Sequence, residues 1–133
     1  MMTDLDKTNY LIEKYYYNPD TARAYVAAKG YCLYCEEAIL KYRTGYSSAA
    51  IDHLLPASKY ESLISNGTNW VFSCSSCNNM KKAFDPLDNG EDALEMLYSK
   101  KEVLIERVRA YLKERIESRT AEFEDVKSLL FDK

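Results

Sequence analysis

The stretch FSCSSCNNMKK, residues 72–82, decides the fold, because it places two cysteines three positions apart at the end of an apolar segment. A second pair with the same spacing lies in YCLYCEE, residues 31–37, and the two pairs hold all four cysteines of the chain. Redox-active pairs and unrelated buried cysteines are the alternatives. Two CxxC pairs with none left over favour one structural, tetrahedral zinc site, with Cys32, Cys35, Cys74 and Cys77 as ligands.

The spacing between the pairs indicates an insertion inside the zinc frame. Thirty-eight residues separate Cys35 from Cys74, whereas a plain zinc ribbon has about 15–20 between its pairs. The inserted segment contains His53, the single histidine of the chain, in IDHLLP at residues 51–56. His53 could complete a Cys₃His zinc site, but four cysteines make that unnecessary.

Length and composition bound the class of protein. A chain of 133 residues with 47% hydrophobic and 29% charged residues is typical of one soluble domain. The net charge of −3 and the pI near 5.3 are unfavourable for a protein that binds nucleic acid through a broad basic surface. The sequence has no apolar run of membrane-spanning length and no signal-like start. We therefore expect a cytoplasmic protein that does not enter a membrane.

Local signals predict the order of the elements. We expect helices over residues 4–16 and over the segment from Asn18, as N-cap, to Gly30. A short helix over 36–43 comes next, then strands over 46–55 and 69–72 with a turn at Asn66-Gly67 between them. A helix opens at SSCNNMKK and ends before Pro86. Three- and four-residue apolar spacing predicts helix over 91–131, with a break near 118–120.

These elements predict a helix-rich α+β fold in a single domain, residues 1–133. We expect an N-terminal helical segment at 1–30, a zinc-stabilised strand–strand–helix core at 31–86 and a C-terminal helical segment at 91–131. The C-terminal segment either packs on the core or offers a surface to a protein partner or a second copy.

The order of polar residues in the middle of the chain resembles the HNH endonuclease family, which has the ββα-metal fold. The pieces are Asp-His in IDHLLP, an asparagine before a strand in TNWVF, and asparagine and lysine three positions apart in CNNMKK. Many members of that family also brace the hairpin with two CxxC pairs. The resemblance covers residues 31–86 and implies metal-dependent hydrolysis of phosphodiester bonds.

Each polar residue of the resemblance has an expected role. His53 is the expected general base, since imidazole titrates near neutrality. Asp52 and Asn78 are expected to hold Mg²⁺ or Mn²⁺ through oxygen atoms, with Asn79 as the rival of Asn78. Lys81 could contact the phosphate, and the family counterpart of Asn69 holds the hairpin in shape. Neighbours on a strand point to opposite faces, so a shared cleft for Asp52 and His53 needs a strand end nearby.

The sequence departs from the family pattern in two respects. Asparagine instead of histidine at the helical metal position favours hard ions. The acidic balance suggests weak binding to nucleic acid without a partner protein, such as an ATPase subunit like those of anti-phage systems that contain small HNH subunits. We expect DNA more than RNA as substrate, and homo-oligomerisation stays open. The alternative hypothesis is an inactive zinc-binding scaffold or binding module.

Overall fold

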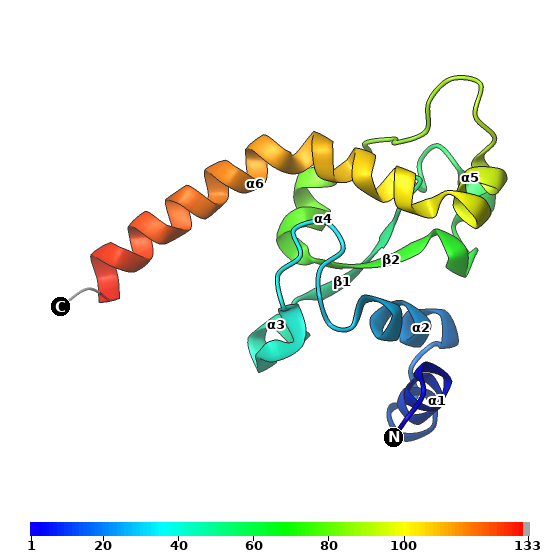
Figure 1. Ribbon diagram of the computed structural model, residues 1–133, viewed down its shortest axis with the longest axis horizontal. Coiled ribbons are helices and arrows are strands. Elements are labelled where there is room, and N and C mark those ends of the chain that lie inside the picture. Colours follow the sequence, from blue (N-terminus) through cyan, green and yellow to red (C-terminus); the bar gives the residue numbers. More distant parts are fainter. Residues whose placement is uncertain (132–133) are drawn as a thin grey trace.

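The computed structural model describes residues 1–131 and shows a small hairpin surrounded by helices (Figure 1). The predicted helix-rich α+β class is confirmed. The elements are α1 (Asp4–Tyr15), α2 (Pro19–Ala28), η1 (Ile39–Lys41), α3 (Arg43–Ser47), β1 (Ala49–His53), η2 (Glu61–Leu63), η3 (Gly67–Asn69), β2 (Trp70–Cys74), α4 (Ser75–Lys81), α5 (Ala93–Ser99) and α6 (Lys101–Phe131).

The N-terminal helices begin where the capping signals place them. In α2 the Asn18 side chain accepts hydrogen bonds from the backbone of Asp20 and Thr21, and Pro19 occupies the first turn, where its missing N–H costs nothing. A left-handed residue, Lys29, ends the helix, and Gly30 follows with φ +83°, a conformation that glycine adopts without strain. The predicted start and end of this helix are confirmed.

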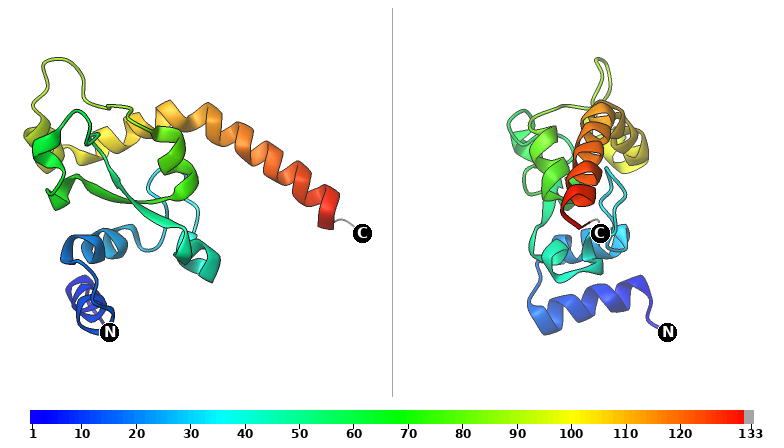
Figure 2. Two further views of the ribbon diagram at one scale, coloured as in Figure 1. Left: turned by 180° about the vertical axis from the view of Figure 1, so that it is seen from behind. Right: turned by 90° about the vertical axis from the view of Figure 1, so that its left-hand side faces the viewer.

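The two strands form an antiparallel hairpin whose register runs from Ala49 opposite Cys74 to His53 opposite Trp70. On one face the buried Phe72 ring packs edge-on against Tyr25 of α2, 4.6 Å between centroids. The other face, which carries Val71, joins the hydrophobic core with α5 and α6. The hairpin therefore lies between α2 and the C-terminal helices (Figure 2).

The first half of α6 supplies much of that core. Leu104, Ile105, Val108 and Leu112 are buried against Leu54, Leu55 and Val71 from the hairpin region. Gly67 allows another close approach, because a Cβ there would lie 2.1 Å from the Asp20 carboxylate at the start of α2. The connection between the strands thereby contacts the N-terminal helices.

Three local predictions were wrong. The strand predicted over 46–55 spans only Ala49–His53, and residues 46–47 belong to α3. Residues 36–43 do not form one helix: Glu36 has φ +65° as part of the first CxxC turn, so η1 and α3 form later in the segment. The C-terminal break lies at Lys100, between α5 and α6, and α6 continues through residues 118–120. Serine and threonine lower helix propensity only slightly, and no glycine or proline stands there to stop the helix. None of the helices within residues 1–131 has the length and apolarity to cross a membrane.

Candidate functional site

The four cysteines meet at one place beside the base of the hairpin. Their sulfur atoms all lie within 4.8 Å of one another, and the Sγ atoms of Cys35 and Cys74 are 3.9 Å apart. All four are free thiols. A tetrahedral zinc ion with bonds of about 2.3 Å separates its sulfur ligands by roughly 3.8 Å. The cluster therefore fits a closed, four-thiolate metal site.

Backbone amides point at the sulfur atoms in both CxxC turns. Cys32 Sγ accepts from the N–H groups of Tyr34 and Cys35, at 3.4 and 3.5 Å, and Cys74 Sγ accepts from Cys77 N–H at 3.3 Å. Hydrogen bonds from the other thiols lower the pKa of Cys32 and raise that of Cys77. N–H donors stabilise negative sulfur, which is the state that binds a metal ion.

The cysteine cluster is tied to the hairpin and to α6. Leu33 N–H donates to the carbonyl oxygen of Phe72 at 3.1 Å, which adds the first CxxC turn to the edge of β2. The Leu33 carbonyl in turn accepts from Arg109 Nε on α6 at 2.6 Å. The sequence analysis missed Arg109, since a lysine or arginine on a helix carries no local signal of a contact 76 positions away.

Asp52 lies at the centre of a buried polar group. Its Oδ2 atom accepts from the Tyr34 hydroxyl at 2.5 Å and lies 3.2 Å from Lys81 Nζ. Burial raises the pKa of Asp52, and Lys81 and Tyr34 oppose that rise. Burial, followed by the charge of Asp52, raises the pKa of Tyr34 well above its usual value, so its hydroxyl stays a donor. Within residues 1–131, the second carboxylate oxygen, Oδ1, has no hydrogen-bond partner.

The Lys81 side chain does not lie at the surface, where the expected contact with a phosphate would place it. Its side chain is fully buried, and Nζ also donates to the backbone carbonyl of His53 at 3.0 Å. A buried ammonium needs a counter-charge, and Asp52 supplies it. Lys81 therefore joins α4 to the end of β1 through Asp52 and the backbone of His53.

His53 is half-buried at the end of β1 and is not part of the hydrophobic core. Its Nε2 atom lies 3.0 Å from the carbonyl oxygen of Ile64, which also accepts from Trp70 Nε1 at 2.9 Å. A carbonyl only accepts, so Nε2 carries the proton and Nδ1 keeps a lone pair. The contact fixes both the tautomer and the direction of the ring.

The strand register separates the side chains of Asp52 and His53. Asp52 stands opposite Val71 and His53 opposite Trp70, and residues opposite one another share a face of the sheet. The two side chains thus start on different faces of the hairpin. His53 is the last residue of β1, so the nearby strand end that a shared site requires is present.

Asn69 closes the far end of the hairpin. It is fully buried, its Oδ1 accepts from Leu55 N–H at 2.7 Å, and its Nδ2 donates to the Leu55 carbonyl at 2.9 Å. This paired contact fixes the chain two residues after His53. The position agrees with the hairpin-bracing role that the resemblance implies.

Asn78 is half-buried on α4, one turn before Lys81, and α4 packs on both strands. Among residues 1–131 its side-chain amide has no hydrogen-bond partner, so its oxygen is free to bind a cation. The neighbouring Asn79 is more exposed and lines a different hollow, between α4 and α6.

The family comparison agrees with this geometry. The model described as HNH endonuclease matches residues 32–84, from the first zinc-site cysteine to just past α4. This segment is thus similar to the HNH endonuclease domain. No curated protein and no solved structure matches the chain. The HNH domain indicates a nuclease-type function and implies contact with nucleic acid.

A basic hollow of about 590 Å³ adjoins the HNH domain, between α4 and α6. Lys82, Arg115 and Arg119 line it, together with Ser76, Asn79 and Tyr111, and no acid within residues 1–131 is part of its lining. Arg115 lies over the Tyr111 ring at 4.8 Å, and that ring stacks on Phe84 at 3.9 Å. The sequence analysis missed this surface, although Arg115 and Arg119 stand four positions apart on one helix.

Proposed function

We propose that the protein is a metal-dependent HNH endonuclease that hydrolyses phosphodiester bonds, with DNA as the favoured substrate. The observation that carries the proposal is the hydrogen bond between His53 Nε2 and the Ile64 carbonyl. It leaves Nδ1 as the proton acceptor and holds the ring in one orientation. General-base catalysis needs a base held in this way beside the attacking water.

In this proposal His53 Nδ1 takes one proton from water as the water oxygen forms a bond to phosphorus. The bond from phosphorus to the leaving oxygen breaks, and solvent protonates that oxygen. Asp52 and Asn78 are the proposed ligands of Mg²⁺ or Mn²⁺, since each offers an oxygen without a hydrogen-bond partner within the described chain. The bound cation would neutralise charge that builds up on the phosphate.

Three residues are proposed to position this centre. Lys81 holds Asp52 and the His53 backbone together, Tyr34 orients the Asp52 carboxylate, and Asn69 fixes the chain after His53. The four-cysteine cluster is proposed to hold a structural zinc ion that braces the base of the hairpin. These residues act through others and do not touch the substrate.

The basic hollow is the proposed surface for the phosphate backbone. Lys82 follows directly after the last residue of α4, four positions beyond Asn78, and lines the hollow. The Arg119–Glu122 ion pair is exposed on both sides, so it contributes little and can be exchanged for a phosphate contact. Local positive charge would then offset the net charge of −3.

The test uses purified zinc-loaded protein with Mg²⁺ or Mn²⁺ on plasmid, linear duplex, single-stranded DNA and RNA. We expect His53→Ala to lower the cleavage rate by about 10²–10⁴ while thermal stability and zinc content are retained. Asn78→Ala should abolish metal-dependent cleavage, whereas Asn79→Ala, which changes only the lining of the hollow, should lower the cleavage rate much less. Cleavage by His53→Ala at the wild-type rate would exclude this site.

The same preparation tests the hollow by binding to a short duplex at several salt concentrations. Each of Lys82→Ala, Arg115→Ala and Arg119→Ala should weaken binding and reduce the salt slope by about 0.9 per lost phosphate contact. Lys113→Ala, an exposed lysine of α6 outside the hollow, is the control. If no variant cuts or binds nucleic acid and wild type does neither, the alternative of an inactive zinc-binding scaffold is favoured.

By analogy with other small HNH subunits, we also propose that the protein acts in the cytoplasm beside a protein partner, such as an ATPase in anti-phage defence. The modest basic surface supports it, since one hollow with three basic side chains gives little affinity for nucleic acid without help.

A further inference from the structure

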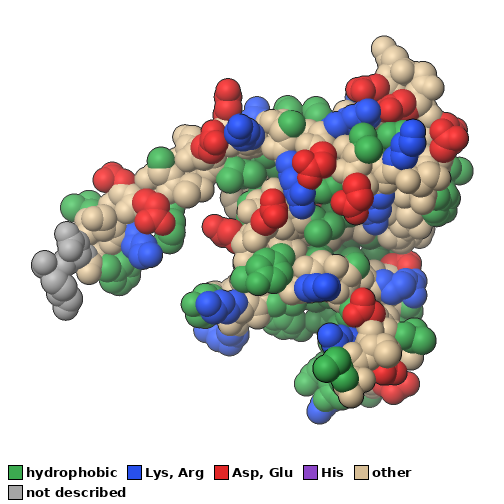
Figure 3. All heavy atoms as spheres, in the orientation of Figure 1, with side chains coloured by type: hydrophobic (Ala, Val, Ile, Leu, Met, Phe, Trp, Pro, Cys, Tyr) green, Lys and Arg blue, Asp and Glu red, His purple; other side chains and the backbone are tan. Residues whose placement is uncertain are grey.

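The end of α6 leaves the body of the protein. Every residue from Glu117 to Phe131 is exposed, and this tail projects away from the other elements (Figure 1). Hydrophobic side chains lie along it (Figure 3), among them Phe123 and Leu130, which are 58% and 67% exposed. An isolated helix of about 15 residues is marginal in water. A second surface that covers these side chains would stabilise the tail.

The tail continues the face of α6 that packs on the core. Leu112 is buried and Ile116 is half-buried against that core. Phe123, Val126 and Leu130 follow Ile116 at steps of seven, three and four residues, which keeps them on the same face of the helix. The apolar face of α6 is thus covered up to Ile116, is interrupted by Arg119 and Thr120, and resumes uncovered from Phe123.

The N-terminal helices carry an apolar groove that could receive the uncovered part of this face. It has a volume of about 380 Å³ and lies between α1, α2 and the segment after Gly30. The groove is lined mainly by Leu11, Tyr17, Tyr25, Val26, Leu40 and Tyr46, and its charged lining residues are Lys7 and Lys29.

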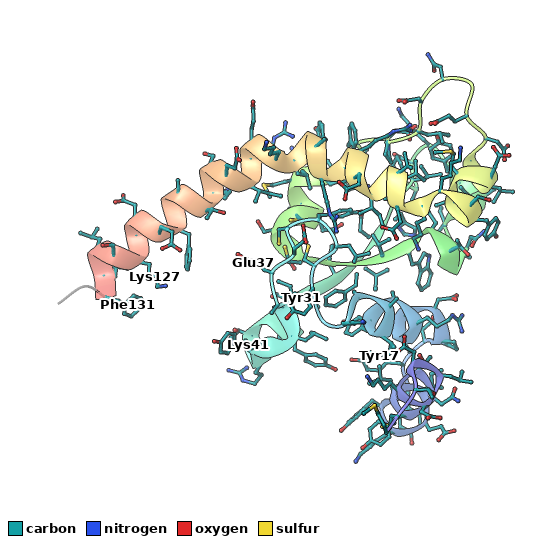
Figure 4. The ribbon with its side chains drawn as sticks, in the orientation of Figure 1. Tyr17, Tyr31, Glu37, Lys41, Lys127 and Phe131 are labelled. Carbon is teal, nitrogen blue, oxygen red and sulfur yellow. The ribbon has the colours of Figure 1, made fainter. Side chains whose placement is uncertain are left out.

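Charge and geometry favour a second copy of this chain as the source of the tail. Residues 117–131 contain four acids and two bases, opposite in sign to the lysines of the groove. The tail cannot reach its own groove, because α6 is one continuous helix and its end at Phe131 lies far from Tyr17 (Figure 4).

Pairing between two tails is less favourable, since both carry the same acidic excess. One contact between two short helices is also small beside the ~1,200–2,000 Å² of a stable interface. We propose that the protein forms a two-fold homodimer by reciprocal exchange, in which the tail of each protomer lies in the Tyr17–Tyr25 groove of the other. Both contacts form together, so the buried area is doubled.

The test measures the mass in solution of the full-length, zinc-loaded chain by light scattering across a concentration series. The wild type should have twice the chain mass. A tail variant, Phe123→Glu with Leu130→Glu, and a groove variant, Lys7→Glu with Lys29→Glu, should each shift to monomer. All four positions are exposed, so folding is retained and circular dichroism checks it. Leu129→Glu, exposed but off the apolar face, is the matched control.

One mixture and one further variant distinguish reciprocal exchange from other modes of dimerisation. The tail variant and the groove variant, mixed in equal amounts, should form a heterodimer that dissociates more readily than the wild-type dimer, because only one intact tail meets one intact groove. Adding Glu122→Lys and Glu124→Lys to the groove variant should restore its homodimer. A monomeric wild type would overturn the proposal, and so would a groove variant that keeps the mass of a dimer. Neither outcome depends on nuclease activity.

Discussion

At the candidate site, one oxygen atom, Asp52 Oδ2, contacts both the Tyr34 hydroxyl and the Lys81 ammonium. The Lys81 side chain is completely buried and that of Asp52 is 8% exposed. A pair of this kind is costly to break from one side, because the remaining charge stays buried without a partner.

We therefore expect Asp52→Ala to lower the free energy of unfolding by about 3–5 kcal/mol, since it strands the Lys81 ammonium. Asp52→Asn combined with Lys81→Met should recover most of that loss, because the volume is kept and no charge is buried. Urea unfolding of zinc-loaded protein measures both. The single variants Asp52→Asn and Lys81→Met are measured as well. If their losses of unfolding free energy add to that of the double variant within about 0.5 kcal/mol, the two residues are not coupled.

Part of this arrangement could be predicted from the sequence. The resemblance indicated that Asn69 braces the hairpin, and its two hydrogen bonds to Leu55 agree with that role. The burial of Lys81 could not be predicted, because lysine is almost always exposed unless it is paired. Its partner Asp52 and the third member, Tyr34, come from separate segments of the chain.

Among the elements, the connection between β1 and β2 matters most for His53, since it carries the Ile64 carbonyl that holds the ring. A hydrogen bond from the Tyr60 hydroxyl to Asp85, 2.7 Å long, ties this connection to the segment after α4. Burial, and then the bond to Asp85, raises the pKa of Tyr60 to about 12.

This raised pKa predicts a dependence of stability on alkaline pH. Below about pH 10 the phenol is protonated in both folded and unfolded chains, so the bond contributes fully. Between about pH 10 and the folded value, the unfolded chain loses its proton first, so this contribution is lost as pH rises. Tyr60→Phe should thus be less stable than wild type at about pH 9, with the gap narrower at about pH 11. A gap that stays constant in urea unfolding would contradict this.

The boundaries of the elements were predictable where capping residues mark them, as at Asn18. They were not predictable where tertiary contacts decide. The apolar spacing of α6 is the same before and after Ile116, so periodicity predicts a helix but not which half of it is covered.

At the scale of the whole molecule, the four-cysteine cluster joins three parts of the fold, through the Leu33 contacts with Phe72 and Arg109. The site was predictable because the CxxC spacing is itself a metal signature. Its link to α6 was not, because the contact spans 76 positions.

Removing the metal should destabilise the whole chain by several kcal/mol, since metal binding to a site that forms only on folding adds its free energy to stability. A strong chelator should lower the midpoint of thermal unfolding, followed by far-UV circular dichroism. The double variant Cys32→Ser with Cys77→Ser should unfold at a lower temperature than wild type, and the chelator should not change its midpoint. An unchanged wild-type midpoint, with no zinc found by elemental analysis, would contradict a structural zinc site.

The core that supports the HNH hairpin is completed from outside the matched residues, by Leu104, Val108 and Leu112 of α6. This has a consequence for how such a nuclease can be inherited. A gene fragment that encodes only residues 32–84, inserted elsewhere by recombination, would deliver the cysteines and His53 with the underside of the hairpin uncovered. The recipient would have to provide a helix of its own with two leucine-sized side chains and one valine-sized side chain at matching positions. We therefore expect the unit that passes between genes to extend at least through the first four turns of α6.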